Sequence, residues 1–365
     1  MVKVALDAAK VQAGAVVNST PSDTTPQPEM LLHATPLPTL PTSLAVMVAH
    51  TTPNKAKLQA ALTRVHDKAN YRQVFAKSPA STGTLPGSLH RAQILAKTSS
   101  NTSLFLRALP TEQDFQFTNK QFIVMLNQYM STITSSHLAI SSLDVHCSCN
   151  SLTPSSPYRN CCDLQHLHNC RQESSFNTRH TALQRTVAAA VTAAGLTPEL
   201  ERPAAPHVNT ASDTRLASKR FDVTIPSTET HSKMLHTDIT VASYTTKQHF
   251  AAASCVPLVN ARKASDGKIA KFRGLFDLEN EAFLPLAFES SGAIHKNVWR
   301  LISQLGSHSG DQAPLQANWT TPTFSSYWMM RLSCILWLET ATSLLRLCAA
   351  AKRRSKSDGE LVTSS

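Results

Sequence analysis

Glycine is scarce in this chain, at 10 of 365 residues, and no Gly-rich phosphate-binding loop is present. This scarcity argues against a P-loop or Rossmann nucleotide enzyme. The N-terminal segment carries Asp7 early and lacks a long apolar run, so we expect neither a signal peptide nor secretion. Internal repeats are also lacking. We therefore expect a protein without repeats whose chemistry comes from other motifs.

The charge balance is basic, with 35 Lys and Arg against 24 Asp and Glu and a net charge of +11. Such an excess favours a polyanionic partner, with nucleic acid first and an acidic membrane surface second, although a merely basic soluble protein has the same balance.

Hydrophobic residues make up 42% of the chain, which is enough for a core. The apolar run Tyr327–Leu338 is interrupted by Arg331 and followed by Glu339 and Arg346, so we expect an amphipathic helix and no membrane span.

Periodicity predicts an α/β core after residue 180, with a small mixed sheet flanked by helices. A helix is expected at Arg179–Ala194 with Gly195 as its C-cap, and a later one at Ala293–Leu305. The expected strands are Phe221–Ile225, Asp238–Tyr244 and Phe283–Glu289, and a further helix is expected around Lys268–Phe276. The expected organisation is a linker or disordered region at 1–54, a helical region at 55–145, a zinc module at 146–180, the core at 181–305, a linker at 306–325, a basic amphipathic helix at 326–352 and a disordered tail at 353–365.

Five of the eight cysteines lie between positions 147 and 170, close to several histidines. In a protein that is not secreted, clustered cysteines indicate metal ligands rather than disulfides. Zinc takes about four such ligands, usually as two close pairs joined by a loop. Cys147 and Cys149 form one pair, and His166 and Cys170 form the other. We therefore expect structural zinc in preference to a chance cluster; the other candidate ligands are Cys161, Cys162 and His168.

Two carboxylates follow on neighbouring β-type segments, at Asp222 and Asp238. The intervening Pro226–Thr237 is consistent with a hairpin that sets them side by side, where they would repel each other without a cation between them. Mg²⁺ or Mn²⁺ held in this way supports phosphodiester hydrolysis. Glu201 is a candidate third ligand, and an ammonium is available on the next helix from Lys268 or Lys271. Spacing alone favours ordinary strand-end acids.

Seven short motifs between Cys147 and Ile294 occur in an order that resembles a known family. They are the Cys147-Ser-Cys149 and His166–Cys170 knuckle, Arg179-His180, Ala194–Thr197 followed by Leu200-Glu201, Arg220–Val223, Thr237–Val241, Lys268–Phe272 and Phe283–Gly292. This stretch resembles the C-terminal restriction-like endonuclease region of non-LTR retrotransposon polyproteins, a branch of the PD-(D/E)XK nuclease superfamily. With flanking segments, the resemblance covers about residues 90–350.

The resemblance implies a zinc knuckle followed by a nuclease-like fold in which Asp222 and Asp238 hold Mg²⁺ or Mn²⁺. It makes Lys268 the first and Lys271 the second candidate for the catalytic lysine, because the superfamily's usual position holds Thr240 here. Phe272 replaces the family's tyrosine. The reverse transcriptase motif Tyr-x-Asp-Asp does not occur, so the chain resembles a detached C-terminal piece of a retroelement reading frame.

Two functions are expected from these patterns. The first is a retroelement-derived, divalent-metal-dependent endonuclease that nicks target DNA in the nucleus, or otherwise resides in the cytoplasm, with retroelement RNA as a further partner. The alternative is a catalytically inactive, zinc-containing remnant that binds nucleic acid. A fragment without a cellular role is a third reading. The geometry of Asp222, Asp238 and a lysine ammonium discriminates between them, because catalysis requires these groups to converge.

Overall fold

The computed structural model describes residues 92, 94–97, 101–108, 113, 116–130, 175–204, 219–227, 232–244, 249–318 and 320–362. The chain divides between Lys68 and Ala69, and every described residue belongs to the second unit. The helices are η1 (Leu104–Arg107, a 3-10 helix), α5 (Asn119–Met130), α7 (Ser175–Ala193), α9 (Phe250–Ala253), α10 (Val259–Phe272), α11 (Lys296–His308) and α12 (Phe324–Val362). The strands are β1 (Glu199–Pro203), β2 (Arg220–Ile225), β3 (Met234–Ala242) and β4 (Glu281–Glu289).

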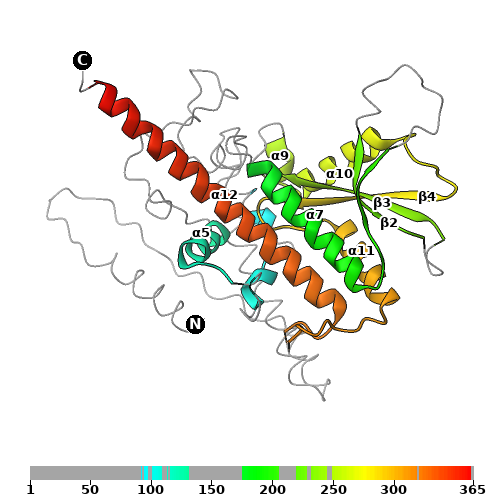
Figure 1. The fold of residues 1–365 in the computed structure, drawn as a ribbon. Helices are drawn as coiled ribbons and strands as arrows, with labels where there is room; N and C mark the ends of the chain where they lie inside the picture. The colour runs from blue at the N-terminus through cyan, green and yellow to red at the C-terminus, as the bar shows by residue number, and fades with distance from the viewer. Residues whose placement is uncertain are drawn as a thin grey trace, which may run out of the picture. The chain divides into compact units, whose positions relative to one another are not determined.

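The strands form one mixed sheet in the order β1-β2-β3-β4 (Figure 1). β1, β2 and β3 pair antiparallel, whereas β4 pairs parallel to β3. A parallel pair needs a crossover connection, and the segment that contains α9 and α10 supplies it. The mixture of helices with a mixed sheet confirms the predicted α/β class.

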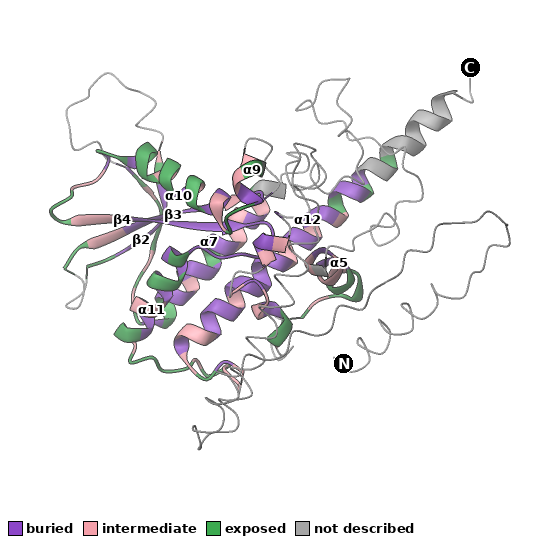
Figure 2. Ribbon diagram, turned by 180° about the vertical axis from the view of Figure 1, so that it is seen from behind, coloured by how far each residue is buried: buried purple, intermediate pink, exposed green. Residues whose placement is uncertain are grey.

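Each face of the sheet is covered by a different set of helices. α10 packs against β3 and β4 on one face, and α7 and α11 pack against the strands with α12 behind them (Figure 1). The larger core contains Val187 of α7, Ile239 of β3 and Leu286 of β4, which are 1% exposed or less. The smaller core, on the α10 side, contains Phe221, Phe272, Leu275, Phe276 and Phe283. The three strands β2, β3 and β4 are therefore covered on both faces, and the central residues of β3 are buried (Figure 2).

The long helix α12 combines an apolar composition with extensive packing against the rest of the unit. Its segment Phe324–Ala350 is long and apolar enough to cross a membrane by length and composition, and 61% of its apolar window is buried inside the structure. It contacts η1, α5, α7 and α11, and Tyr327 and Trp337 are almost completely buried. Much of this apolar segment is therefore packed against other elements of the unit.

A tight turn after β4 brings the main chain against the indole of Trp337. Gly292 has a φ of 88°, and a Cβ at this position would lie 2.3 Å from Trp337 Nε1. The indole N–H donates to the main-chain oxygen of Thr102 at 3.2 Å, so the ring cannot easily move away. Glycine fits here because it adopts the left-handed backbone readily and, without a Cβ, leaves room for the Trp337 indole.

Several element boundaries differ from those predicted. β1 was not predicted, because Glu199–Pro203 is polar, mostly exposed and without alternation. β3 begins at Met234, four residues before the predicted start, so Asp238 lies inside the strand. α10 ends at Phe272 because Arg273 is extended and Gly274 has a φ of 77°. α12 continues to Val362 through the predicted tail, in a stretch without proline and with many good helix formers.

Candidate active site

Asp222 and Asp238 lie on adjacent strands at the centre of the sheet. The antiparallel register pairs Val223 with Thr237, which brings the preceding Asp222 beside Asp238. Their residues are only 6% and 4% exposed. A buried pair of carboxylates is unfavourable unless positive charge or hydrogen bonds compensate it. The surroundings of the two acids show how this compensation is arranged.

Asp222 receives two contacts at the same oxygen. His180 Nε2, on α7, lies 2.9 Å from Asp222 Oδ2. The main-chain N–H of Ile239, on β3, donates to that same Oδ2. The hydrogen bond to Asp222 raises the pKa of the His180 imidazole, although partial burial opposes this effect. This hydrogen bond compensates part of the cost of burying the Asp222 carboxylate.

Asp238 is paired with a lysine from the opposite side of the site. Lys268, on α10, forms an ion pair with Asp238 Oδ2, and its side chain is 24% exposed. Burial raises the pKa of the Asp238 carboxyl, and the neighbouring Asp222 raises this pKa further, while Lys268 and then Lys271 oppose the rise. The two acids, the His180 imidazole and the Lys268 ammonium therefore form one cluster between α7 and α10.

The structure separates the two predicted lysines. Lys268 reaches the acid, whereas Lys271 is exposed and places its ammonium 4.9 Å from the centre of the Phe272 ring. Lys271 influences Asp238 only through its charge. Of the two lysines, Lys268 is therefore the one that contacts an acid of the pair.

Glu201 lies at the margin of this cluster, on the exposed strand β1. Its Oε1 accepts a hydrogen bond from Gln184 Nε2 at 2.6 Å, and Gln184 Nε2 also donates to the main-chain oxygen of Asp222 at 2.9 Å. In the part of the chain that the structure describes, no three Asp, Glu, His or Cys side chains gather closely enough to hold a metal. Glu201 is thus linked to Asp222 through Gln184, and its role as a third ligand stays a prediction.

Two carboxylates nevertheless suit one class of cation. Mg²⁺ keeps several waters and is commonly bound by one or two protein carboxylates together with substrate phosphate oxygens. The pairing of buried Asp222 and Asp238 fits such a cation, which would relieve their mutual repulsion. The predicted zinc ligands Cys147, Cys149, His166 and Cys170 lie outside the described residues.

His180 and Gln184 were missed as members of the acidic site from sequence alone. The Arg179-His180 pair was interpreted as the opening of a helix and, by its position, as the end of the zinc module. His180 and Gln184 stand four residues apart on α7, so they share one face of the helix. That spacing was the available signal, but nothing in the sequence showed that this face meets β2.

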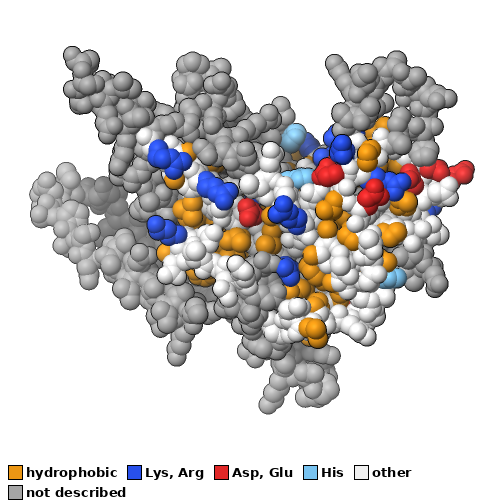
Figure 3. Space-filling view, viewed as in Figure 1, with side chains coloured by type: hydrophobic (Ala, Val, Ile, Leu, Met, Phe, Trp, Pro, Cys, Tyr) orange, Lys and Arg blue, Asp and Glu red, His pale blue; other side chains and the backbone are white. Residues whose placement is uncertain are grey.

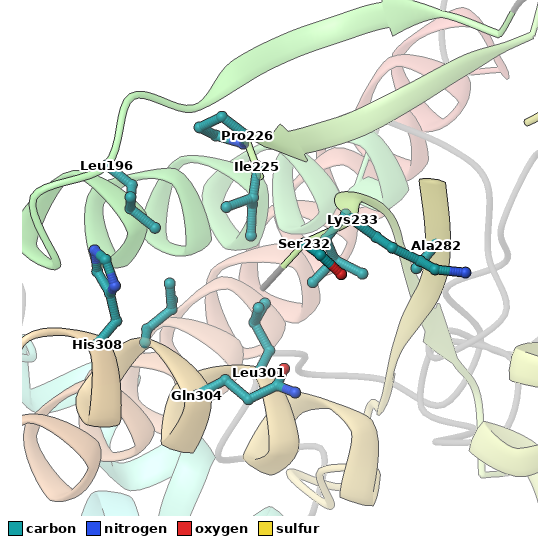
Figure 4. Close-up of a pocket in the computed structure, with 11 residues that line it drawn as sticks. Leu196, Ile225, Pro226, Ser232, Lys233, Ala282, Leu301, Gln304 and His308 are labelled. Carbon is teal, nitrogen blue, oxygen red and sulfur yellow. The ribbon is translucent and has the colours of Figure 1, made fainter. Parts of the chain in front are cut away.

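A separate cavity of about 310 Å³ lies near Ile225 and Leu235, at the other end of the β2–β3 pair (Figure 4). Its walls are mainly apolar, with Gln304 and His308 contributed by α11. Lys233 extends away from it and donates to the main-chain oxygen of Leu278 at 2.6 Å. Neither Asp222 nor Asp238 lines this cavity, so the acidic cluster is a distinct site.

Positive and negative side chains are interspersed on the face shown in Figure 3, with acids and bases side by side over the sheet.

A comparison with known protein families finds none that matches this chain, and no curated protein matches it.

Proposed function

We propose that the chain is a retroelement-derived, divalent-metal-dependent DNA endonuclease-like domain, of PD-(D/E)XK type, that nicks target DNA. The observation that carries this proposal is the convergence of Asp222, Asp238 and Lys268. These residues come from β2, β3 and α10 and meet as buried carboxylates with one ammonium. Acids that merely end their strands, without a shared role, would not need to lie together beside a lysine.

The roles follow from charge and position. Asp222 and Asp238 would hold Mg²⁺ or Mn²⁺, which when bound supplies Lewis-acid activation of phosphate and water. Lys268, which is partly exposed, orients the attacking water or stabilises the negative charge that develops on the phosphate. Glu201 assists from the edge of the site through Gln184. Burial of the acids keeps bulk water away and strengthens each of these interactions.

The wider proposal includes parts of the chain outside the described residues. A structural zinc ion bound by Cys147, Cys149, His166 and Cys170 would form a knuckle before the nuclease-like core. DNA would be the substrate and retroelement RNA a further partner, and a DNA substrate would make the nucleus the expected location. The net charge of +11 supports a polyanionic partner.

A second candidate is a nucleic-acid-binding remnant without cleavage activity. Two observations favour it: Lys268 is already engaged with Asp238, and the described residues offer no third clustered ligand. On this reading the cations simply neutralise two buried acids. It predicts salt-dependent binding to DNA, with a slope set by the number of phosphate contacts, and no product.

Plasmid nicking by the full chain tests the proposal. Wild-type protein with Mg²⁺ or Mn²⁺ is expected to convert supercoiled plasmid to the nicked form. Asp238→Asn is expected to lower the rate by about 100-fold or more, a loss typical of removing a key electrostatic group. The matched control is Asp266→Asn, on the exposed face of α10, which should cut normally.

Binding is measured on the same samples by titrating labelled DNA at several salt concentrations. Cleavage that depends on both metal and Asp238 supports the endonuclease. Salt-dependent binding without cleavage supports the remnant instead. Protein that neither binds nor cuts DNA contradicts both candidates.

A further inference from the structure

His180 contacts the acidic site formed by Asp222 and Asp238. It lies in the second turn of α7, and its side chain is 33% exposed. Its Nε2 contacts Asp222 Oδ2 at 2.9 Å, and Asp238 and Lys268 are near enough to influence it through their charges. The ring is therefore directed at the predicted metal ligands.

α7 holds Asp222 at two points. His180 contacts the carboxylate, and Gln184, one turn later, donates to the main-chain oxygen of the same residue. From the opposite side, the N–H of Ile239 donates to Asp222 Oδ2. Two donors that converge on one carboxylate oxygen fix the rotation of the group. They also leave Oδ1 as the oxygen that can face a cation.

We propose that His180 is a positioning residue that orients the Asp222 carboxylate so that Oδ1 binds the divalent cation. This inference rests on the metal site of the proposed function. Groups that hydrogen-bond to metal ligands set the direction of the ligand's lone pairs, and their loss commonly weakens metal binding by about 10- to 100-fold. His180 acts through Asp222 and need not touch the substrate.

The alternative for His180 is a purely structural contact between α7 and β2. The contact pattern argues against this, since α7 is already anchored by the completely buried Leu183 and Val187. Gln184 supplies a further hydrogen bond to β2. A partly exposed histidine adds little to such packing, whereas its direction toward Oδ2 determines how Asp222 presents its other oxygen.

The test measures Mn²⁺ binding to the full chain by calorimetry, without DNA. The relevant signal is the part of the binding that Asp238→Asn abolishes, which separates this site from the cysteine cluster. His180→Ala is expected to raise the Mn²⁺ dissociation constant by about tenfold. His180→Gln should restore most of the affinity, because the glutamine amide can donate from a similar distance along the side chain. His308→Ala, on the exposed end of α11, is the matched control and should bind as wild type does.

Nicking assays over a range of Mn²⁺ concentrations add a second readout. The positioning role predicts that His180→Ala needs more metal but regains most of the wild-type kcat at saturation. Unchanged Mn²⁺ affinity in His180→Ala would overturn the inference, as would equal losses in the Ala and Gln variants. A fall in kcat that saturating metal does not restore would also overturn it, because it would indicate direct action on the substrate.

The outcomes separate this inference from the proposed activity. Wild-type protein that binds Mn²⁺ through Asp238 and His180 but leaves plasmid intact supports the positioning role and contradicts the endonuclease. Wild-type protein without Asp238-dependent Mn²⁺ binding overturns both. Circular dichroism of each variant confirms that a loss of binding reflects the site and not unfolding.

Discussion

Replacement of Glu289 by glutamine is expected to reduce the pH dependence of folding stability. Glu289 ends β4 and is 2% exposed. Its Oε1 accepts the main-chain N–H of Ala261 in the first turn of α10 at 3.2 Å, and its Oε2 accepts the Ser291 hydroxyl at 3.4 Å. Burial raises the pKa of Glu289 from 4.5 to about 7, and these hydrogen bonds only partly oppose the rise.

The sign of the effect follows from linkage. The folded state holds the proton more tightly than the unfolded state, so this contribution to stability is complete below pH 4.5 and is lost as the pH rises through about 7. With these two pKa values, the contribution falls by about 2 kcal/mol between about pH 5.5 and about pH 8.5. The amide of the glutamine variant does not titrate, so the variant would not show this loss.

The assay is urea unfolding of wild type and Glu289→Gln, followed by circular dichroism across this pH range. Other titrating groups occur in both proteins and largely cancel in the difference between their unfolding free energies. That difference should move in favour of the variant by about 2 kcal/mol as the pH rises. A difference that stays constant with pH would refute the assignment of a raised pKa to this carboxyl.

Three further results are expected. Gly292→Ala should lower the free energy of unfolding by at least about 2 kcal/mol in urea titrations, because a left-handed backbone and the Trp337 indole both oppose a Cβ. Gly267→Ala, in α10 with open space around it, should instead stabilise the protein by about 0.5–1 kcal/mol; equal effects of the two substitutions would contradict this packing. Elemental analysis should find bound zinc in the wild type and much less in Cys147→Ser, and equal contents would exclude Cys147 as a ligand.

The sequence was sufficient to predict elements whose local pattern matches their environment. The alanine-rich run after Arg179 forms α7, and the β-branched run at Phe221–Ile225 forms β2. The apolar run at Phe283–Glu289 forms β4, which is buried as expected. In these segments, propensity, periodicity and burial all favour the same structure.

The other features of the fold and of the site depend on tertiary contacts, which local sequence patterns do not indicate. β1 is polar and exposed, and its extended conformation depends on antiparallel pairing with β2. The pairing of Lys268 with Asp238 requires the packing of α10 on β3, and the contact of His180 with Asp222 requires α7 to meet β2. The order of motifs predicted Asp222, Asp238 and Lys268 as candidates, whereas the contact of His180 with Asp222 became visible only in the fold.

The central claim is that Asp222, Asp238 and Lys268 form a metal-dependent nuclease site. The most direct measurement is the time course of supercoiled plasmid with the full chain and Mn²⁺, compared with Asp238→Asn. We predict nicked product from the wild type, none after chelation by EDTA, and about 100-fold less from the variant. Plasmid that stays supercoiled with the wild type, or is cut equally by Asp238→Asn, would contradict the claim.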